Sequence, residues 1–266
     1  MADFRVGCVP YLNARPLVYG LETREEVSLT FDTPSRLAQS LETGELDVAM
    51  VSSLFALSSL GTCVVGGVSI SSRGKVESVR LFSKVPFGDI RTLALDQSSL
   101  SSNALCRIVL AEMYGVRPEE THAPPDLPAM LEQHDAALLI GDPGMRAQPP
   151  EGVFVLDLGK AWEELTDRPF VWAAWIGFER VEGPLAAILF DAKERGKENL
   201  EAIALREAER SGWPLALCRR YLIEVMDYEL DTEHLEALML FGELCVRHSI
   251  LPRYDLPAIV GGLPTG

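Results

Sequence analysis

Serine residues dominate one segment of this chain that could bind an anion. Ser98 to Ser102 lie between a predicted strand at 92–95 and a predicted helix. The N–H groups at the start of a helix lack partners inside the helix and carry partial positive charge. Serine hydroxyls beside them add donors, so the segment could bind a carboxylate without a full cation. Its candidate ligands are Ser99, Ser101 and Ser102.

Other small polar residues stand where further predicted strands begin or end. Ser52 and Ser53 precede another predicted helix and could hold a second carboxylate in the same way. The remaining members of the group are Asn13, Ser78, Gly141 and Asp142. Each of them alone could simply cap a helix or form a turn. Together they mark the rim of a predicted cleft.

The motifs of several other chemistries are not found in the sequence. No GxGxxG, GxxxxGK[ST], HExxH or GxSxG segment occurs. The five cysteines are widely spaced and form no CxxC pair, which argues against a zinc ribbon and a disulfide framework. Among the four histidines, His122 in a predicted loop is the candidate for a protein base. We expect neither a metal site nor another cofactor.

The charge of the chain excludes some classes of partner. Lys and Arg number 24 and Asp and Glu 39 among 266 residues, so the formal net charge is −15. Without a concentrated basic stripe, such a protein repels nucleic acids and anionic lipid, and neither is expected as a partner. The N-terminus lacks a signal-peptide pattern, and no apolar run approaches the ~20 residues of a membrane span. We therefore expect a cytoplasmic protein.

The elements that would position these residues are short apolar strands alternating with helices. Strands are predicted at 4–9, 27–31, 46–51 and 136–140. Thr33 and Pro34 open a predicted helix that ends at Gly44, with Pro at its first position. This order is typical of an α/β fold with a largely parallel sheet.

Two α/β segments are followed by a helical remainder at 184–250 and a tail at 252–266 that is predicted to be irregular. Crossings between the segments are predicted near 84–90 and 171–178. An inner lobe at 87–174 would then be inserted into an outer lobe formed by 1–86 and 175–266. Ligands of such folds bind between domains and at the carboxyl ends of strands, which predicts a cleft. The exposed face of the C-terminal helices could make a homodimer contact.

Four segments carry a resemblance to a known family: 6–17 (VGCVPYLNARPL), 32–37 (DTPSRL), 44–49 (GELDVA) and 137–142 (ALLIGD). Over residues 4–250 the chain resembles the chorismate dehydratases of the futalosine route to menaquinone, in the periplasmic-binding-protein-like superfamily. The resemblance implies a two-lobed fold of the type II periplasmic binding proteins. It also implies a lyase reaction, in which chorismate loses water to give 3-[(1-carboxyvinyl)oxy]benzoate.

The resemblance places a functional asparagine at Asn13 and an active-site serine at Ser78, with Tyr11 in the same first loop as Asn13. Residues 72–77 depart from the family's pattern, and a shift of register there would move the serine's role to another residue. A sister family, which makes 1,4-dihydroxy-6-naphthoate, shares the fold. Its first loop reads Pro-Cys-Pro-Asn-Asp, whereas PYLNA here favours the dehydratase. A non-catalytic binding protein for a small carboxylate is the other alternative.

Loss of the C3 proton and the C4 hydroxyl would make the ring of chorismate aromatic, so the reaction needs only modest acid–base help. We expect both carboxylates of the substrate at helix N-termini, with Asn13 and Ser78 donating to groups that gain charge. The substrate's own enolpyruvyl carboxylate is the candidate base. A dianion in a protein of charge −15 requires a locally positive cleft, with Arg15 or Arg73 as possible helpers and the acids mainly on the outer faces.

Overall fold

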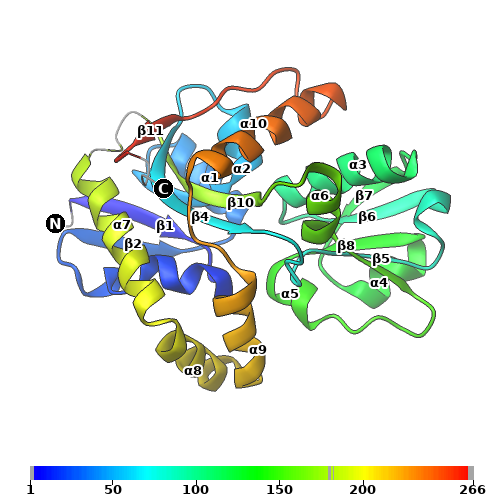
Figure 1. The fold of residues 1–266 in the computed structure, drawn as a ribbon, viewed down its shortest axis with the longest axis horizontal. Helices are drawn as coiled ribbons and strands as arrows, with labels where there is room; N and C mark the ends of the chain where they lie inside the picture. The colour runs from blue at the N-terminus through cyan, green and yellow to red at the C-terminus, as the bar shows by residue number, and fades with distance from the viewer. Residues whose placement is uncertain (1–2, 179–180, 182, 263–266) are drawn as a thin grey trace.

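The computed structural model describes residues 3–178, 181 and 183–262, and Figure 1 shows two sheets side by side with helices around each. The first sheet has six strands in the order β11–β4–β10–β3–β1–β2. The second has five strands in the order β7–β6–β8–β5–β9. The bounds of the strands of the first sheet are β1 Phe4–Cys8, β2 Val27–Phe31, β3 Val48–Ser52, β4 Cys63–Ser72, β10 Phe170–Gly177 and β11 Ala258–Val260.

The first sheet is parallel except for one strand. β1 pairs in parallel with β2 and β3, and β4 pairs in parallel with β11. β10 runs antiparallel between β3 and β4. β3 and β4 are buried along almost their whole length, as is typical of strands covered on both faces, and β4 carries three buried serines, Ser69, Ser71 and Ser72. The predicted largely parallel sheet is confirmed here.

The second sheet repeats this plan with one antiparallel strand. Its strands are β5 Arg80–Ser83, β6 Thr92–Asp96, β7 Glu119–Ala123, β8 Ala136–Leu139 and β9 Phe154–Asp157. β6 pairs in parallel with β7 and β8, whereas β5 runs antiparallel between β8 and β9. The helices of this part are α3 Ser101–Tyr114, α4 Leu127–Gln133, α5 Gly141–Arg146 and α6 Leu158–Thr166.

Helix ends follow the predicted signals. α1 (Pro34–Glu42) begins with Pro in its first turn after Thr33, and Gly44 follows its end with φ +72°. α3 ends at Gly115, which adopts the left-handed conformation with φ +69°. α2 (Ser53–Ser58) begins directly after β3, where Ser52 accepts a hydrogen bond from the N–H of Phe55.

The chain changes sheet at two places that differ from the predicted crossings. β5 already pairs in the second sheet, so the first change falls between Ser72 and Arg80, ahead of the predicted 84–90. β10 pairs in the first sheet along its whole length, so the second falls between Asp157 and Phe170. The boundaries drawn at 86 and 174 therefore do not coincide with the changes of sheet. The reason is that β5 finds its partners 50 or more residues further along the chain.

The C-terminal part is helical, as predicted, up to residue 247. It contains α7 Gly183–Glu198, α8 Leu200–Ser211, α9 Leu215–Arg219, a π-helix at Arg220–Val225 and α10 Thr232–Arg247. The tail differs from the prediction, because β11 forms a parallel edge strand against β4. Short 3-10 turns occupy Leu12–Val18, Leu21–Thr23 and Phe87–Asp89.

An aromatic cluster packs the second change of sheet against α10. The ring of Trp162 on α6 meets Phe170 of β10 edge-on, with centroids 5.2 Å apart, and Phe170 meets Phe241 of α10 at 4.9 Å. Edge-to-face pairs of this kind add to the burial of apolar surface. Within the described ranges, none of the helices is long and apolar enough to cross a membrane.

Candidate active site

A cavity lies between the two sheets, and together with the open solvent at its mouth it occupies about 630 Å³. Its walls come from the loop after β1, from β3, β4 and β10 of the first sheet, and from the segments before α3 and α5 of the second. Eight of the predicted site residues line it: Tyr11, Asn13, Ser52, Ser78, Ser99, Ser101, Ser102 and Gly141. Ser53 and Asp142, the other two, adjoin lining residues in the chain but do not line the cavity.

The N-termini of α2 and α3 meet at one wall of this cavity. The hydroxyls of Ser53 and Ser101 lie 2.9 Å apart, and Ser101 Oγ accepts a hydrogen bond from the N–H of Leu54 at 2.9 Å. Both serines are almost fully buried. They therefore join the first sheet to the second through the starts of two helices.

Other serines of this wall shape the backbone. Ser99 Oγ accepts a hydrogen bond from the N–H of Ser102 at 3.2 Å. The buried amide of Asn103 donates to the carbonyls of Asp96 and Ser99, which holds the loop between β6 and α3. Ser102 adds a buried hydroxyl to the cavity wall. The wall thus presents hydroxyls and the start of a 14-residue helix, whose partial positive charge favours an anion.

Asn13 and Ser78, which also line the cavity, are joined through a tyrosine. The hydroxyl of Tyr221 donates to Ser78 Oγ at 2.8 Å, and Asn13 Nδ2 donates to the Tyr221 oxygen at 3.3 Å. Burial raises the pKa of Tyr221 far above its usual value, so it remains protonated. Asn13 Oδ1 is buried and has no hydrogen-bond partner within the part of the chain that the structure describes. An unpaired buried acceptor beside a cavity can bind a donor of a ligand.

Ser78 is the last residue of a three-residue turn with unusual backbone geometry. Its N–H bonds to the carbonyl of Val76 at 2.8 Å, and Glu77 between them has φ +63°. This form of γ-turn is rare and strained for a residue with a side chain. The carboxylate of Asp157 secures it by accepting from the N–H groups of Val76 at 3.0 Å and Glu77 at 2.7 Å. Strain held in this way is a feature of functional sites, and here it immediately precedes Ser78.

Close packing fixes the far side of the turn and the loop that follows β8. A Cβ on Gly144 would lie 2.1 Å from the Ser78 carbonyl oxygen, so this position admits only glycine without movement. A Cβ on Gly141, which has φ +57°, would lie 3.6 Å from the ring of Tyr11. Burial raises the pKa of Tyr11 and also that of Asp142. The two groups flank the cavity where the loop after β1 meets the start of α5.

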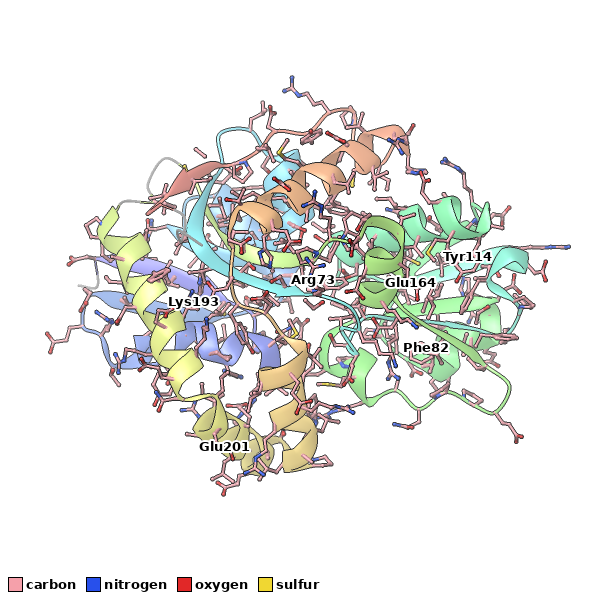
Figure 2. The ribbon with its side chains drawn as sticks, viewed as in Figure 1. Arg73, Phe82, Tyr114, Glu164, Lys193 and Glu201 are labelled. Atoms are coloured by element: carbon pink, nitrogen blue, oxygen red, sulfur yellow. The ribbon has the colours of Figure 1, made fainter. Side chains whose placement is uncertain are left out.

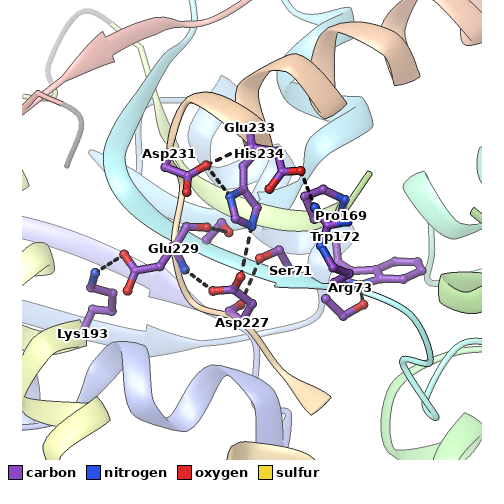
Figure 3. Close-up of polar contacts among 12 residues, drawn as sticks. Ser71, Arg73, Pro169, Trp172, Lys193, Asp227, Glu229, Asp231, Glu233 and His234 are labelled. Atoms are coloured by element: carbon purple, nitrogen blue, oxygen red, sulfur yellow. Dashed lines mark hydrogen bonds and ion pairs between the residues drawn. The ribbon is translucent and has the colours of Figure 1, made fainter. Parts of the chain in front are cut away.

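The lining of the cavity carries no Asp, Glu, Lys, Arg or His among the described residues. The proposed helpers lie elsewhere. Arg15 donates to the carbonyl of Pro10 and lies 3.5 Å from Glu207, and it is not part of the lining. Arg73, labelled in Figure 2, pairs with Glu233 in the first turn of α10, as Figure 3 shows. Neither arginine therefore touches the cavity, and the donors that line it are backbone N–H groups, hydroxyls and the Asn13 amide.

The wall formed by β4 is braced from behind by a polar network (Figure 3). Ser71 and Asp227 exchange backbone hydrogen bonds at 2.9 Å. The buried ring of His234 bonds through Nδ1 to Asp231 at 2.8 Å and contacts Asp227 through Nε2 at 3.3 Å. Lys193, also buried, pairs with Glu229 at 2.7 Å. The network therefore attaches the segment before α10 to the strand that lines the cavity.

Tyr221 and Trp172 belong to the site but were not among the predicted residues. Tyr221 lies in the π-helix, 208 positions from Asn13, so no local spacing could point to it. Trp172 of β10 lines the cavity and donates from Nε1 to Ser72 Oγ at 2.9 Å.

His122, the candidate base, lies exposed on β7 and is not in the lining. In the described ranges no group of three or more His, Cys, Asp or Glu residues is placed to hold a metal.

Comparison with known proteins identifies relatives along nearly the whole chain. The model of a family described as "Menaquinone biosynthesis" matches residues 4–247. A chorismate dehydratase of Thermus thermophilus is 31% identical over 265 residues, covering 91% of this chain and 95% of that protein.

Solved structures agree on the fold. The alkanesulfonate-binding protein of Xanthomonas axonopodis pv. citri superposes with a TM-score of 0.71 at 18% identity, covering 95% of each chain. A Candida albicans protein described as having the generic periplasmic-binding-protein fold gives a TM-score of 0.57 at 10% identity, covering 96% of this chain and 98% of that one. At these identities the likeness concerns the fold alone, and it confirms the predicted periplasmic-binding-protein-like α/β architecture.

Proposed function

Since the chain belongs to the menaquinone-biosynthesis family, we propose that it is a chorismate dehydratase, a hydro-lyase that converts chorismate to 3-[(1-carboxyvinyl)oxy]benzoate and water. The observation that carries the proposal at the site is the hydrogen-bonded chain from Asn13 through Tyr221 to Ser78 at the wall of the cavity. The two residues that the family resemblance singles out are thereby brought to one place.

In this proposal the ring of the substrate lies in the cavity between the sheets. The C4 hydroxyl faces Ser78 and Asn13, which donate to oxygen atoms that gain charge as the C4–O bond breaks. The carboxylates lie near the serine-rich wall, where α3 begins and Ser102 lines the cavity. Tyr11 and Gly141 also line the cavity, where the loop after β1 meets the start of α5.

The enolpyruvyl carboxylate of the substrate accepts the C3 proton in this scheme. The lining supports it, because no Asp, Glu, His or Lys side chain within the described ranges lines the cavity to act as a base. The C3–H and C4–O bonds break, a C3–C4 double bond forms, and the proton and hydroxide leave as water. A pH–rate profile for kcat should then show no essential group near neutrality. An essential group near pH 7 would contradict the substrate-base scheme.

The test is to incubate the purified protein with chorismate and to follow the aromatic product by ultraviolet absorbance and NMR. Asn13→Ala and Ser78→Ala should each lower kcat by about 10²- to 10³-fold, the usual effect of removing one donor to a developing oxyanion. Ser83→Ala and Asn199→Ala are matched controls, since Ser83 Oγ bonds to Val85 and Asn199 Nδ2 to Arg195, both outside the lining. The controls should retain the activity of the unaltered protein.

Two results would overturn the proposal. Tight binding of chorismate without product would favour a small-carboxylate binding protein. Full activity of both Asn13→Ala and Ser78→Ala would remove the two residues from the reaction. A cytoplasmic location and a homodimer, both expected from the sequence, remain predictions.

A further inference from the structure

Two neighbouring residues of the π-helix contact two neighbouring residues of the turn before β5. Arg220 Nη2 lies 2.7 Å from Glu77 Oε2, and the next residue, Tyr221, donates from its hydroxyl to Ser78 Oγ at 2.8 Å. The pairs are 143 positions apart in the sequence. The π-helix is thus set in register against the strained turn, with an ion pair on the outside and a buried hydrogen bond beside the cavity. π-helical turns are rare and often occur at functional sites.

The direction of the hydrogen bonds determines what Ser78 can do. The Tyr221 hydroxyl has one hydrogen, which it donates to Ser78 Oγ, and its oxygen accepts from Asn13 Nδ2. Ser78 Oγ therefore acts as an acceptor toward Tyr221, and its own hydrogen remains for a donor bond into the cavity. Hydrogen bonds that follow one another in the same direction polarise one another, which makes the last donor, the Ser78 hydroxyl, a stronger one. Because burial raises the pKa of Tyr221, the phenol keeps its hydrogen across the physiological range.

We propose that Tyr221 is the positioning residue of this site: it turns the Ser78 hydroxyl hydrogen toward the bound substrate and holds the Asn13 amide beside it. This inference rests on the proposed dehydratase function. Tyr221 neither gains nor loses a proton during the reaction. It acts through Ser78, whose hydroxyl donates to the C4 oxygen as the C4–O bond breaks, while the C3 proton goes to the enolpyruvyl carboxylate.

The variant that tests the role is Tyr221→Phe, which removes the hydroxyl and keeps the ring. Ser78 then loses its donor and its hydrogen can turn away from the substrate. We expect kcat to fall about tenfold or more, with KM changed less than about threefold, because the lost bond matters chiefly in the transition state. Tyr228→Phe is the matched control. Tyr228 is also buried and donates to the carbonyl of Leu222 at 3.2 Å, outside the lining. Its kcat should stay within about twofold of the unaltered protein.

A double-mutant cycle separates positioning from a general structural effect. If Tyr221 acts through Ser78, Tyr221→Phe should lower kcat less in a Ser78→Ala background than in the unaltered protein, because only its contact with Asn13 is then left to lose. Independent, multiplying losses in the double variant would overturn the inference. So would unchanged kcat for Tyr221→Phe in a protein that still turns over chorismate, which would leave the proposed function intact. Absence of turnover in the unaltered protein would overturn both.

Discussion

Asp157 offers the sharpest test of how the turn before Ser78 is held in place. One carboxylate oxygen, Oδ1, accepts from the N–H groups of Val76 and Lys160, and the other, Oδ2, accepts from Glu77 at 2.7 Å. In Asp157→Asn a single amide oxygen replaces the two carboxylate oxygens. If it stands where Oδ1 was and accepts from Val76 and Lys160, the NH₂ group takes the place of Oδ2. The NH₂ group then faces the N–H of Glu77, and that hydrogen bond is lost.

The magnitude follows from the kind of bond. A hydrogen bond to a charged group contributes about 1.5–3 kcal/mol, and a partly buried donor left unpaired adds to its loss. We therefore expect Asp157→Asn to lower the free energy of unfolding by about 2–3 kcal/mol. The turn carries a non-glycine residue at φ +63°, so losing its support should also displace Ser78. On that ground kcat should fall about tenfold or more, since the proposed donor to the breaking bond would be displaced.

The measurement is urea unfolding with the slope compared between variants, together with kcat for chorismate. Asp126→Asn is the control, because Asp126 also caps a helix but its side chain accepts from Ala129 alone, at 3.2 Å. Asn and Asp are about equally good at this position, so the control should change stability by less than about 0.5 kcal/mol. Equal effects of the two substitutions, or a loss below about 1 kcal/mol with unchanged kcat, would refute the assigned role of Asp157.

The remaining predictions concern the packing behind Ser78 and the network behind β4. Gly144→Ala places a Cβ 2.1 Å from the Ser78 carbonyl oxygen, so it should lower the free energy of unfolding by about 1–3 kcal/mol and also lower kcat. In the control Gly183→Ala the added Cβ meets no atom within 4 Å, so thermal unfolding and activity should hardly change. Burial opposes the charge on His234, but Asp227 and Asp231 prevail and raise its pKa. Its stabilisation is therefore fully present below the unfolded pKa of ~6.5 and is lost as pH rises through the raised folded value. As pH rises from the unfolded to the folded pKa of His234, the unfolding free energies of the unaltered protein and of His234→Gln should converge. A difference between the two that does not depend on pH would contradict this.

Local sequence signals predicted the elements that depend on local features. β3 is an apolar run because it is buried along almost its whole length. α1 begins at Pro34, and glycines follow the ends of α1 and α3, at Gly44 and Gly115, for steric reasons confined to a few residues. β7, by contrast, is exposed along nearly all of its length and has no apolar pattern to reveal it. β11 is a three-residue edge strand recognised only by its pairing with β4. The tail's Pro and Gly content concealed that pairing.

Placement of β5 and Tyr221 depends on contacts that are distant in the sequence. β5 has only four residues and joins the second sheet because β8 and β9 flank it. Tyr221 lies in a π-helix, rather than in a continued α-helix, after α9, and its hydroxyl bonds to Ser78 at the wall of the cavity. A helical pattern read from the sequence does not distinguish the two geometries. The candidate residues could therefore be named from strand ends and family resemblance, while the hydrogen-bonded chain that joins two of them could not.

The uncharged lining of the cavity also bears on how an acidic protein could act on a dianion. A buried arginine or lysine would hold the carboxylates strongly in the ground state, and binding substrate and transition state equally does not raise kcat. Neutral donors and the start of α3 stabilise an anionic atom less than a full charge would, but they do so at fixed positions. The acids of the outer surface act weakly at the cavity, because physiological salt screens exposed charges beyond ~8 Å. In the proposed reaction aromaticity favours the loss of water, so the site would need chiefly to stabilise the departing oxygen. The chain from Asn13 through Tyr221 to Ser78 is suited to that task, and the serine-rich wall to recognition of the carboxylates.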